Sequence, residues 1–354
     1  MGIMSKFFFR DKPVVGLDFS QTSLKAMSID PKRVSVLGYG SIDLDPARVQ
    51  EALETGNPAY LSSSLSTLLQ EKLIGKISSN HAVMSIPTPR TYTRSFTLPL
   101  DAEGHLHDAI VLEAEQYIPV PLSQLYTDYE IIERSKDKIS VLLCAVPQRI
   151  VDVCTAAARK VGLRVVMIEP SISAVARLLT HTEEGHLPTV IVDIGPANTD
   201  IAILDGAVRV TGGIAIGGNT FTIDIARRLR VPLENAHQLK VLHGLNAGPR
   251  QIEIVSALEP NLKRVTAEIK KVMRYFSERI DPDKKLEQVI IVGGGSNIPG
   301  LGDYFTNGLI MPARIASPWQ VLDFSELSQP SRQFKPRYIT VAGLASVDPR
   351  KILA

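Results

Sequence analysis

Two short polar turns, each following an apolar stretch, hold the residues of this sequence that are best suited to chemistry. Residues 14–25 read VVGLDFSQTSLK, in which Asp18 is followed by the hydroxyl side chains of a polar reversal. The layout returns in TVIVDIGPANTD at 189–200, where Asp193 precedes a second polar turn. Either turn alone is typical of an ordinary hairpin, because Asp and Ser side chains bond to turn backbone groups. As a pair, two such turns suit a polyphosphate, which main-chain N–H groups and hydroxyls can hold.

The two aspartates also predict a metal ion. Carboxylates aimed at phosphates would repel them, but a Mg²⁺ ion between the two turns this repulsion into attraction, because Mg²⁺ takes one or two carboxylates together with phosphate oxygens. Asp18 and Asp193 are therefore candidate Mg²⁺ ligands, and a nucleoside polyphosphate is the candidate ligand of the turns.

A glycine-rich turn, GGGSNIPG at 293–300, follows a third apolar strand. Its glycines permit close approach of a flat ligand to the backbone, and Pro299 is suited to the start of a helix. Alone, such a turn indicates only a tight connection. The sequence contains no G-x-x-x-x-G-K-[ST] motif, which excludes a P-loop enzyme, and no glycine pattern at a first βα turn with a ribose-binding acid beyond it, which argues against a dinucleotide fold.

Composition indicates an ordinary globular chain. Its 354 residues predict about two domains. The hydrophobic content is 44%, the charged content 21% and the net charge +2, so nothing in the balance demands a nucleic-acid partner. No apolar run approaches the ~18 residues of a membrane helix and no signal-peptide layout is present, so we expect a cytoplasmic protein. Cys144 and Cys154 are expected to be buried free thiols.

The N-terminal stretch MGIMSKFFFRDK places three phenylalanines between two basic residues. This pattern suits contact with a membrane surface or a partner, and it equally suits a frayed tail. The sequence leaves the two readings open.

The elements that must position these residues fall into two similar halves. We expect a tail at 1–13, a first lobe formed by 14–87 and 162–187, a second lobe at 188–346 with a smaller subdomain at 232–288, and a C-terminal tail at 347–354. Residues 88–161 read as an inserted βαββα unit that ends in the helix PQRIVDVCTAAARKVG. The stretch EPNLKRVTAEIKKVMRYFSERI, from 259 to 280, predicts a long amphipathic helix.

These segments resemble, in order, the nucleotide-binding superfamily of actin, sugar kinases and Hsp70. The matching segments are the Asp18 hairpin, IEPSISAVARLL (168–179), VDIGPANTDIAIL (192–204), GGNTFTIDIA (217–226) and VGGGSNIPGL (292–301). The resemblance implies an α/β protein of the actin-like ATPase fold, with two duplicated ribonuclease-H-like lobes around a nucleotide cleft. The insert, with LPL at 98–100 and EAEQYIPVPLSQLYTDYEII at 113–132, resembles that of the PilM family of type IV pilus assembly proteins, and FtsA carries a related one.

The resemblance also implies roles for individual residues. Asp18 and Asp193 would face Mg²⁺, and Glu169 matches an acidic residue that orients the attacking water in some relatives, so Glu169 and Asp193 are the candidate catalytic residues. Ser20 stands where the superfamily usually has glycine. The candidate ATP-binding residues are Ser20, Thr22, Ser23, Gly195, Asn198, Thr199, Gly217, Gly218, Asn219, Glu268, Lys271, Gly294, Gly295 and Asn297. For Glu268 and Lys271, an exposed ion pair one turn apart is the competing interpretation.

The function that the resemblance implies is an ATP-binding scaffold with at most slow ATPase activity. It would act in pilus biogenesis and twitching motility at the inner face of the cytoplasmic membrane, and it would hold the cytoplasmic tail of a PilN-like membrane protein. Pilus motor ATPases and further copies of the chain are additional candidate partners. An FtsA-like filament-forming ATPase and a small-molecule kinase of the same fold are the alternatives.

Overall fold

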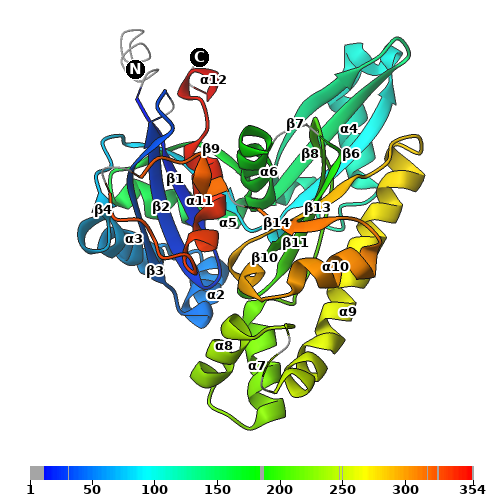
Figure 1. Cartoon of the computed structure of the whole chain (residues 1–354). Coiled ribbons are helices and arrows are strands. Elements are labelled where there is room, and N and C mark those ends of the chain that lie inside the picture. Colours follow the sequence, from blue (N-terminus) through cyan, green and yellow to red (C-terminus); the bar gives the residue numbers. More distant parts are fainter. Residues whose placement is uncertain are drawn as a thin grey trace. The chain divides into compact units, whose positions relative to one another are not determined.

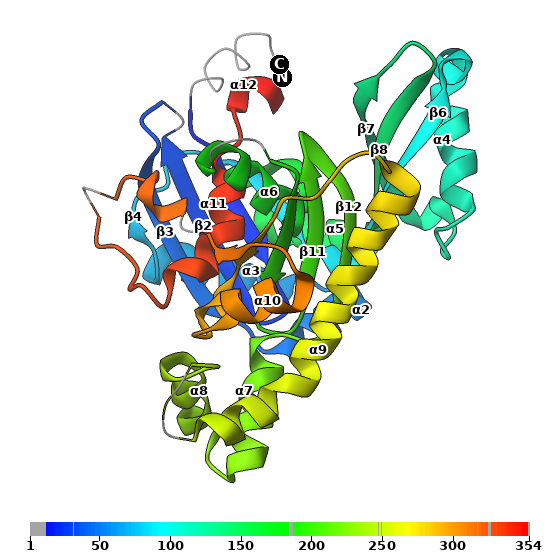
Figure 2. The ribbon, with the colours of Figure 1, turned by 45° about the vertical axis from the view of Figure 1, so that its right-hand side comes forward.

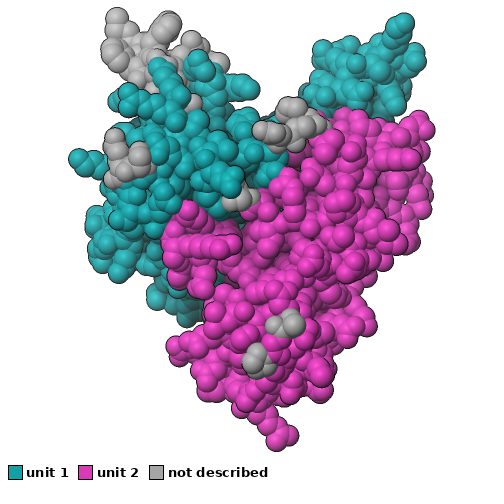
Figure 3. Space-filling view, in the orientation of Figure 1, with its two compact units in different colours: residues 1–183, 318–329, 338–354 teal, residues 184–317, 330–337 magenta. Residues whose placement is uncertain are grey.

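The computed structural model describes residues 12–352 apart from residues 31, 184–186, 247, 249, 317, 325 and 326. The chain divides into two compact units (Figure 3). Unit 1 comprises residues 1–183, 318–329 and 338–354, and unit 2 comprises residues 184–317 and 330–337. Each unit has its own main sheet. The question left open for the N-terminal stretch falls on residues 1–11, outside the described part of the chain.

Unit 1 contains a six-stranded sheet in the order β4-β3-β2-β1-β5-β9 (Figure 1). Its strands are β1 (Val15–Phe19), β2 (Ser23–Asp30), β3 (Ser35–Asp43), β4 (Ile74–Gly75), β5 (His81–Ile86) and β9 (Arg164–Pro170). The first four strands pair antiparallel as a meander, whereas β1, β5 and β9 run parallel. The carboxyl ends of the parallel strands therefore lie at the same edge of the sheet. Asp18 is the next-to-last residue of β1, close to that edge.

Helices cover both faces of this sheet. Val15, Leu17 and Phe19 face a core formed with α2 (Pro46–Thr55), α3 (Ala59–Glu71) and α5 (Gln148–Lys160). The alternate residues of β1 face α6 (Ser171–Thr182) and α11 (Ile339–Ala345), as expected for the period of two in a strand. Gly16 lies on that second face, where an added Cβ would meet the Val341 carbonyl at 2.6 Å, so only glycine lets α11 pack this closely.

Helix α5 packs on the parent sheet rather than on the insert. Its buried residues, Ile150, Val153, Cys154, Ala157 and Ala158, join the core beside α3. The reason is topological, because parallel strands β5 and β9 need a crossover connection and α5 supplies it. The structure thus assigns this helix to the first lobe, which shortens the predicted insert to a βαββ unit. The free thiol of Cys154 is buried as predicted, and burial raises its pKa to about 12.

The insert is a three-stranded antiparallel sheet, β6-β8-β7, formed by β6 (Tyr92–Pro99), β7 (Leu125–Arg134) and β8 (Lys138–Pro147). Helix α4 (Leu106–Glu115) lies along one face of the sheet (Figure 2). Its residues Ile110 and Ala114 pack against Ile139, Val141 and Leu143 of the central strand β8. The opposite face carries the alternate residues of these strands.

Unit 2 repeats the strand order of unit 1. Its sheet runs β12-β11-β10-β13-β14, with β10 (Thr189–Ile194), β11 (Thr199–Asp205), β12 (Ala207–Ile214), β13 (Gln288–Val292) and β14 (Ala313–Ile315). The strands β10, β11 and β12 form the meander, and β13 and β14 are parallel to β10, as β5 and β9 are to β1. The predicted duplication is therefore confirmed at the level of topology and register.

Helices α7 (Gly218–Leu229), α8 (Leu233–Leu242), α9 (Gln251–Tyr275) and α10 (Leu301–Leu309) complete unit 2. Helix α9 begins eight residues before the predicted start at 259 and continues through Pro260. Buried Ile254 and Leu258 in its first turns explain this, because their burial in the core offsets the hydrogen bond that a proline removes. Helix α7 packs on both α8 and α9, so the helical part of the unit starts before the predicted boundary at 232.

The C-terminal segment belongs to unit 1 and not to the second lobe in which 339–346 was predicted. Helix α11 is buried along its whole length against β1 and α6, and a short helix α12 (Pro349–Ile352) follows. An added Cβ at Gly343 would lie 2.0 Å from the Ala174 carbonyl, which marks the tight crossing of α11 and α6. A seven-residue apolar helix carries no sequence signal of which sheet it covers.

Candidate functional site

The turn after Asp18 is closed by the hydroxyl side chain of Ser20. The Ser20 amide donates to the Ser23 carbonyl at 2.9 Å, and the Ser20 hydroxyl lies 2.9 Å from both the carbonyl and the hydroxyl of Ser23. The Ser23 amide donates back to the Ser20 hydroxyl at 3.0 Å. Thr22 is half-buried, and its carbonyl accepts from the Leu44 amide. The predicted phosphate-lining residues of this turn thus lie together, held by their own hydrogen bonds.

Asp18 is paired with a lysine that the sequence analysis missed. Lys25 stands opposite Asp18 in the antiparallel register of β1 and β2, and its Nζ donates to Asp18 Oδ2 at 2.8 Å and to the Ser23 hydroxyl at 2.9 Å. The Ser85 hydroxyl donates to Asp18 Oδ1 at 2.9 Å. Both side chains of the ion pair are about nine-tenths buried, at 11% and 8% exposure. A strand-register argument could have found Lys25, because residues equidistant from a hairpin turn face each other.

The polar row continues across the parallel strands to Glu169. Ser85 is the register partner of Glu169, as Asp18 is of Ser85. Glu169 is buried, and both its oxygens accept from the guanidinium of Arg177, with Nη1 at 2.6 Å from Oε1. Arg177 also donates to the Gly343 carbonyl of α11. Burial raises the pKa of the Glu169 carboxyl, and Arg177 opposes that rise.

The second turn repeats the geometry of the first. The Gly195 amide donates to the Asn198 carbonyl at 2.9 Å, the counterpart of the bond between Ser20 and Ser23. The residue opposite Asp193 is Asp200, so a carboxylate stands where unit 1 has Lys25. The Asn198 side-chain amide donates to Asp200 Oδ1 at 2.7 Å. Thr199 is fully buried and its hydroxyl donates to the Ile216 carbonyl, so in this structure it secures the turn.

The start of helix α7 lies directly on this second turn. The Gly218 amide donates to the Gly195 carbonyl at 2.9 Å and the Asn219 amide to the Pro196 carbonyl at 2.8 Å. An added Cβ at Gly217 would come within 2.7 Å of Pro196 backbone atoms, so glycine is required for the approach. Three predicted residues, 217 to 219, are thereby brought to the Asp193 turn.

The glycine-rich turn at 293–295 also packs against the end of β10, at Asp193 and Ile194. Gly293 has a φ of +82° and an added Cβ there would lie 2.1 Å from Asp193 Oδ1. An added Cβ at Gly295 would lie 2.2 Å from the side chain of Ile194. Asn297 points elsewhere, since its side-chain amide donates to the Gln333 carbonyl. Within unit 2 the predicted groups around Asp193, Gly217 and Gly294 therefore form one cluster.

A buried lysine that the sequence analysis missed belongs to this cluster. Lys240 of α8 is 5% exposed, and its Nζ donates to the Gly218 carbonyl and to the Thr222 hydroxyl, both at 2.7 Å. Burial, and secondarily the nearby Arg337, lowers its pKa to about 8. Arg337 itself has its side chain against Gly294. No motif marks Lys240, because it sits in an ordinary amphipathic helix and is placed only by the packing of α8 on α7.

Glu268 and Lys271 do not join this cluster through any contact of their described side chains. Lys271 Nζ lies 3.1 Å from Glu268 Oε1, and the lysine side chain is 75% exposed. The Glu268 carboxylate lies beside Gly212 on β12, the strand at the edge of the sheet. The ion-pair interpretation fits what the structure shows, and their contact with a nucleotide stays a prediction.

The two predicted Mg²⁺ ligands, Asp18 and Asp193, differ in how well their surroundings suit a metal ion. Both oxygens of Asp18 already accept hydrogen bonds, one of them from a cation, which leaves it better suited to binding metal-bound water than the metal. Asp193 and Asp200 are register partners on neighbouring strands, so they bring together two carboxylates, which are ligands that Mg²⁺ takes in proteins. The described residues contain no group of three or more His, Cys, Asp or Glu side chains arranged for a metal.

The fold is shared with proteins of known structure. One is the "PilM-PilN type IV pilus biogenesis complex", with a TM-score of 0.78, 23% identity and coverage of 95% of this chain and 98% of that chain. Another is MreB5 of Spiroplasma citri bound to ADP, with a TM-score of 0.50, 14% identity and coverage of 94% and 95%. These similarities confirm the predicted actin-like ATPase fold.

Sequence comparison gives the family. The cell division protein FtsA of Pseudomonas aeruginosa is 27% identical over 278 residues, which are 66% of this chain and 63% of that protein. The chain thus spans less than two thirds of this relative, and about half of the FtsA of Neisseria meningitidis serogroup B. The family model for the type IV pilus assembly protein PilM matches residues 16–347. With that match over nearly its whole length, the chain belongs to the PilM family of actin-like proteins.

Proposed function

We propose that this chain is an ATP-binding scaffold of type IV pilus assembly that holds the cytoplasmic tail of a PilN-like inner-membrane protein. The observation that carries the nucleotide part is the repeated turn. The backbone amides of Ser20 and Gly195 each donate a 2.9 Å hydrogen bond to the carbonyl three residues later. The two residues stand at equivalent positions in the two duplicated sheets. A structural neighbour of the same fold, MreB5, is bound to ADP.

In unit 2, the parts have distinct roles in this proposal. The N-terminus of α7 lies on the second turn, and its helix dipole favours phosphate oxygens there. Lys240 supplies a positive charge beside Gly218. Asp193, with Asp200 opposite, holds Mg²⁺, which when bound would neutralise phosphate charge. Arg337 and the glycine turn at 293–295 provide a surface for the base.

In unit 1, Lys25 is the phosphate ligand that we add to the predicted hydroxyls of the first turn. Its ammonium is already held beside the Ser23 hydroxyl, so the turn carries a fixed cation. Glu169 has both carboxylate oxygens bonded to Arg177, which leaves it poorly placed to take a proton from water. We therefore expect tight nucleotide binding with slow turnover.

The tail site is placed on the face of the insert sheet that α4 leaves uncovered. Leu142 and Cys144 of β8 lie on that face, and their register partners on β7 are the exposed acids Glu130 and Asp128. Burial raises the pKa of the Cys144 thiol to about 11, and Glu169 contributes to that rise, so this end of the face lies toward β9 of the parent sheet. On this face Leu142 lies between Ser95 of β6 and Glu130 of β7, and a carboxylate border of this kind suits a peptide that carries basic residues.

Membrane association through such a partner follows from this proposal. None of the helices in the part of the chain that the structure describes has the length and apolar character of a bilayer span. The structural neighbour that contains PilN supports this choice of partner.

The test is calorimetric titration of Mg·ATP into the purified protein, with phosphate release followed in the same sample. Micromolar binding with little turnover supports the scaffold, whereas rapid turnover with a hydroxyl acceptor would make it a kinase. Asp193→Ala should abolish binding, whereas Asp283→Ala, which changes an exposed aspartate of the same unit, should not. A PilN-type tail peptide is then titrated with and without ATP. Full tail affinity in the Asp193→Ala protein would refute the coupling of the two ligands, and no nucleotide binding at all would refute the ATP role.

A further inference from the structure

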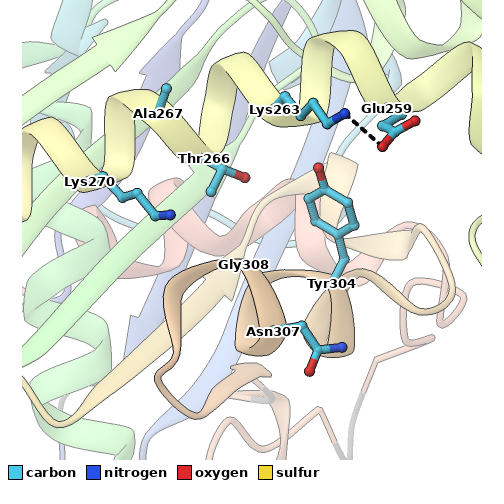
Figure 4. A pocket seen from close by; sticks show the side chains of 8 residues that line it. All are labelled: Glu259, Lys263, Thr266, Ala267, Lys270, Tyr304, Asn307 and Gly308. Atoms are coloured by element: carbon cyan, nitrogen blue, oxygen red, sulfur yellow. Dashed lines mark ion pairs between the residues drawn. The ribbon is translucent and has the colours of Figure 1, made fainter.

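A pocket between helices α9 and α10 of unit 2 lies outside every site described above. It has a volume of 520 Å³ and is lined by Glu259, Lys263, Thr266, Ala267, Lys270, Tyr304, Asn307 and Gly308 (Figure 4). Gly308 sets its floor, because an added Cβ there would lie 3.4 Å from Thr266 Cγ2. The Tyr304 side chain extends from α10 toward α9 (Figure 4). The small residues Ala267 and Gly308 leave the pocket open, and polar side chains line the rest of it.

Two lysines stand at opposite ends of this hollow. Lys263, Ala267 and Lys270 follow the i, i+4, i+7 spacing, so they share one face of α9 with the alanine in the middle. Among the residues that the structure describes, Lys263 pairs with Glu259 in an exposed i, i+4 contact. The Lys270 side chain makes no ion pair or hydrogen bond within the described part of the chain. Across residues 259–274 there are five Lys and Arg side chains against two carboxylates, so this part of α9 is net positive and attracts anions.

The same chain carries the complementary surface on its insert. Residues 101–133 contain eight Asp and Glu residues and no Lys or Arg. On the outer face of α4, Asp108, Leu112 and Glu115 repeat the i, i+4, i+7 spacing, and Leu112 is 64% exposed. Glu115 lies in the last turn of α4, where the helix dipole disfavours a carboxylate, so helix stability does not account for it.

We propose that α4 of one molecule docks in the α9–α10 pocket of a second molecule. In this contact Leu112 enters the hollow over Ala267 and Gly308, and the two carboxylates meet the two lysines. The match is geometric, because seven residues span about 10.5 Å on each helix, which sets equal distances between the charges of each pair. An exposed leucine between two acids and a small-residue hollow between two bases are complementary in shape and in charge.

This contact joins two different surfaces, so it is heterologous and leaves one of each surface open at the ends of every assembly. Molecules would therefore add head to tail. Exposed ion pairs are screened by salt, so assembly should be concentration-dependent and weaken as the ionic strength rises. The inference does not depend on nucleotide or tail binding.

The experiment measures the weight-average mass by sedimentation velocity over a range of concentrations, at about 20 mM and about 500 mM salt. The wild-type chain should assemble at low salt. The variants Asp108→Lys/Glu115→Lys and Lys263→Glu/Lys270→Glu should each assemble about 100-fold more weakly, because each puts like charges in contact. The matched control for the lysine variant is Arg227→Glu/Arg228→Glu, which makes the same charge change on exposed residues of α7 and should assemble like the wild type.

The most informative measurement is made on a mixture of the two charge-reversal variants. Each variant alone has two surfaces of the same sign, but in a mixture every acidic surface can find a basic one, so alternating assemblies should form. Recovery in the mixture also shows that both variants are folded. A wild-type chain that stays monomeric at low salt, a reversed variant that assembles normally, or a mixture that stays monomeric would each overturn the proposal.

Discussion

Replacing Lys240 with methionine should remove a pH-dependent component of stability. Lowering the pKa of Lys240 from 10.5 to about 8 means that the charged form is disfavoured in the folded protein. At about 1.4 kcal/mol for each pH unit, the cost is roughly 3 kcal/mol. The unfolded chain binds the proton up to pH 10.5 and the folded chain only up to about pH 8. The cost is therefore fully present below pH 8, and stability contributed at this site rises as the pH increases from about 8 to 10.5.

The assay is urea unfolding followed by circular dichroism, for wild type and Lys240→Met, at intervals from about pH 7.5 to 10. The methionine also loses the hydrogen bonds to Gly218 and Thr222, worth about 1.5 to 3 kcal/mol each, so the two proteins should have similar stability at pH 7.5. The wild type should then gain up to roughly 3 kcal/mol over the variant toward pH 10. Lys271→Met, at an exposed position, is the control. A difference that does not change with pH would refute the reasoning.

Three further predictions concern other buried groups. Gly293→Ala should destabilise the protein by about 3 kcal/mol or more and abolish nucleotide binding, because its φ is positive and its Cβ would overlap the Asp193 carboxylate; chemical denaturation and calorimetry test this. Arg177→Met should cost about 3 to 5 kcal/mol at neutral pH by leaving Glu169 buried without its partner. Since burial already raises the pKa of Glu169, acidification should reduce that loss, and melting curves at about pH 7.5 and 5.5 would show no such recovery if the reasoning is wrong. Cys154, whose pKa is about 12, should resist iodoacetamide at pH 8 until the protein unfolds, and mass spectrometry that finds rapid labelling of the native protein would contradict its burial.

The sequence was most informative where a pattern repeats. The Asp18 and Asp193 turns could be paired from their layout alone, and the structure confirms the duplicated strand order that the pairing predicts. Gly217 and the glycine-rich turn that begins at residue 293 were also found, because close backbone approach leaves glycine as the one acceptable residue.

Packing between elements distant in the sequence was beyond such patterns. Lys240 reaches Gly218 only because α8 packs on α7, and helix periodicity says that a face is buried without saying against what. The same limit applies to α5, which periodicity identified and whose partner sheet it could not name. Lys25 could have been predicted from the sequence, since strand register places it opposite Asp18.

The way the insert is attached has a consequence for how such proteins can diversify. Its first and last strands, β6 and β8, are neighbours, and Tyr92 near the entry is the register partner of Ala145 near the exit. Partners in an antiparallel pair lie only about 5 Å apart at their Cα atoms, so the parent chain leaves and returns at nearly the same point. The insert could therefore be gained or lost without rearranging the parent lobe, and a two-residue turn could replace it. The insert is thus attached as a module that could be exchanged without changing the parent lobe.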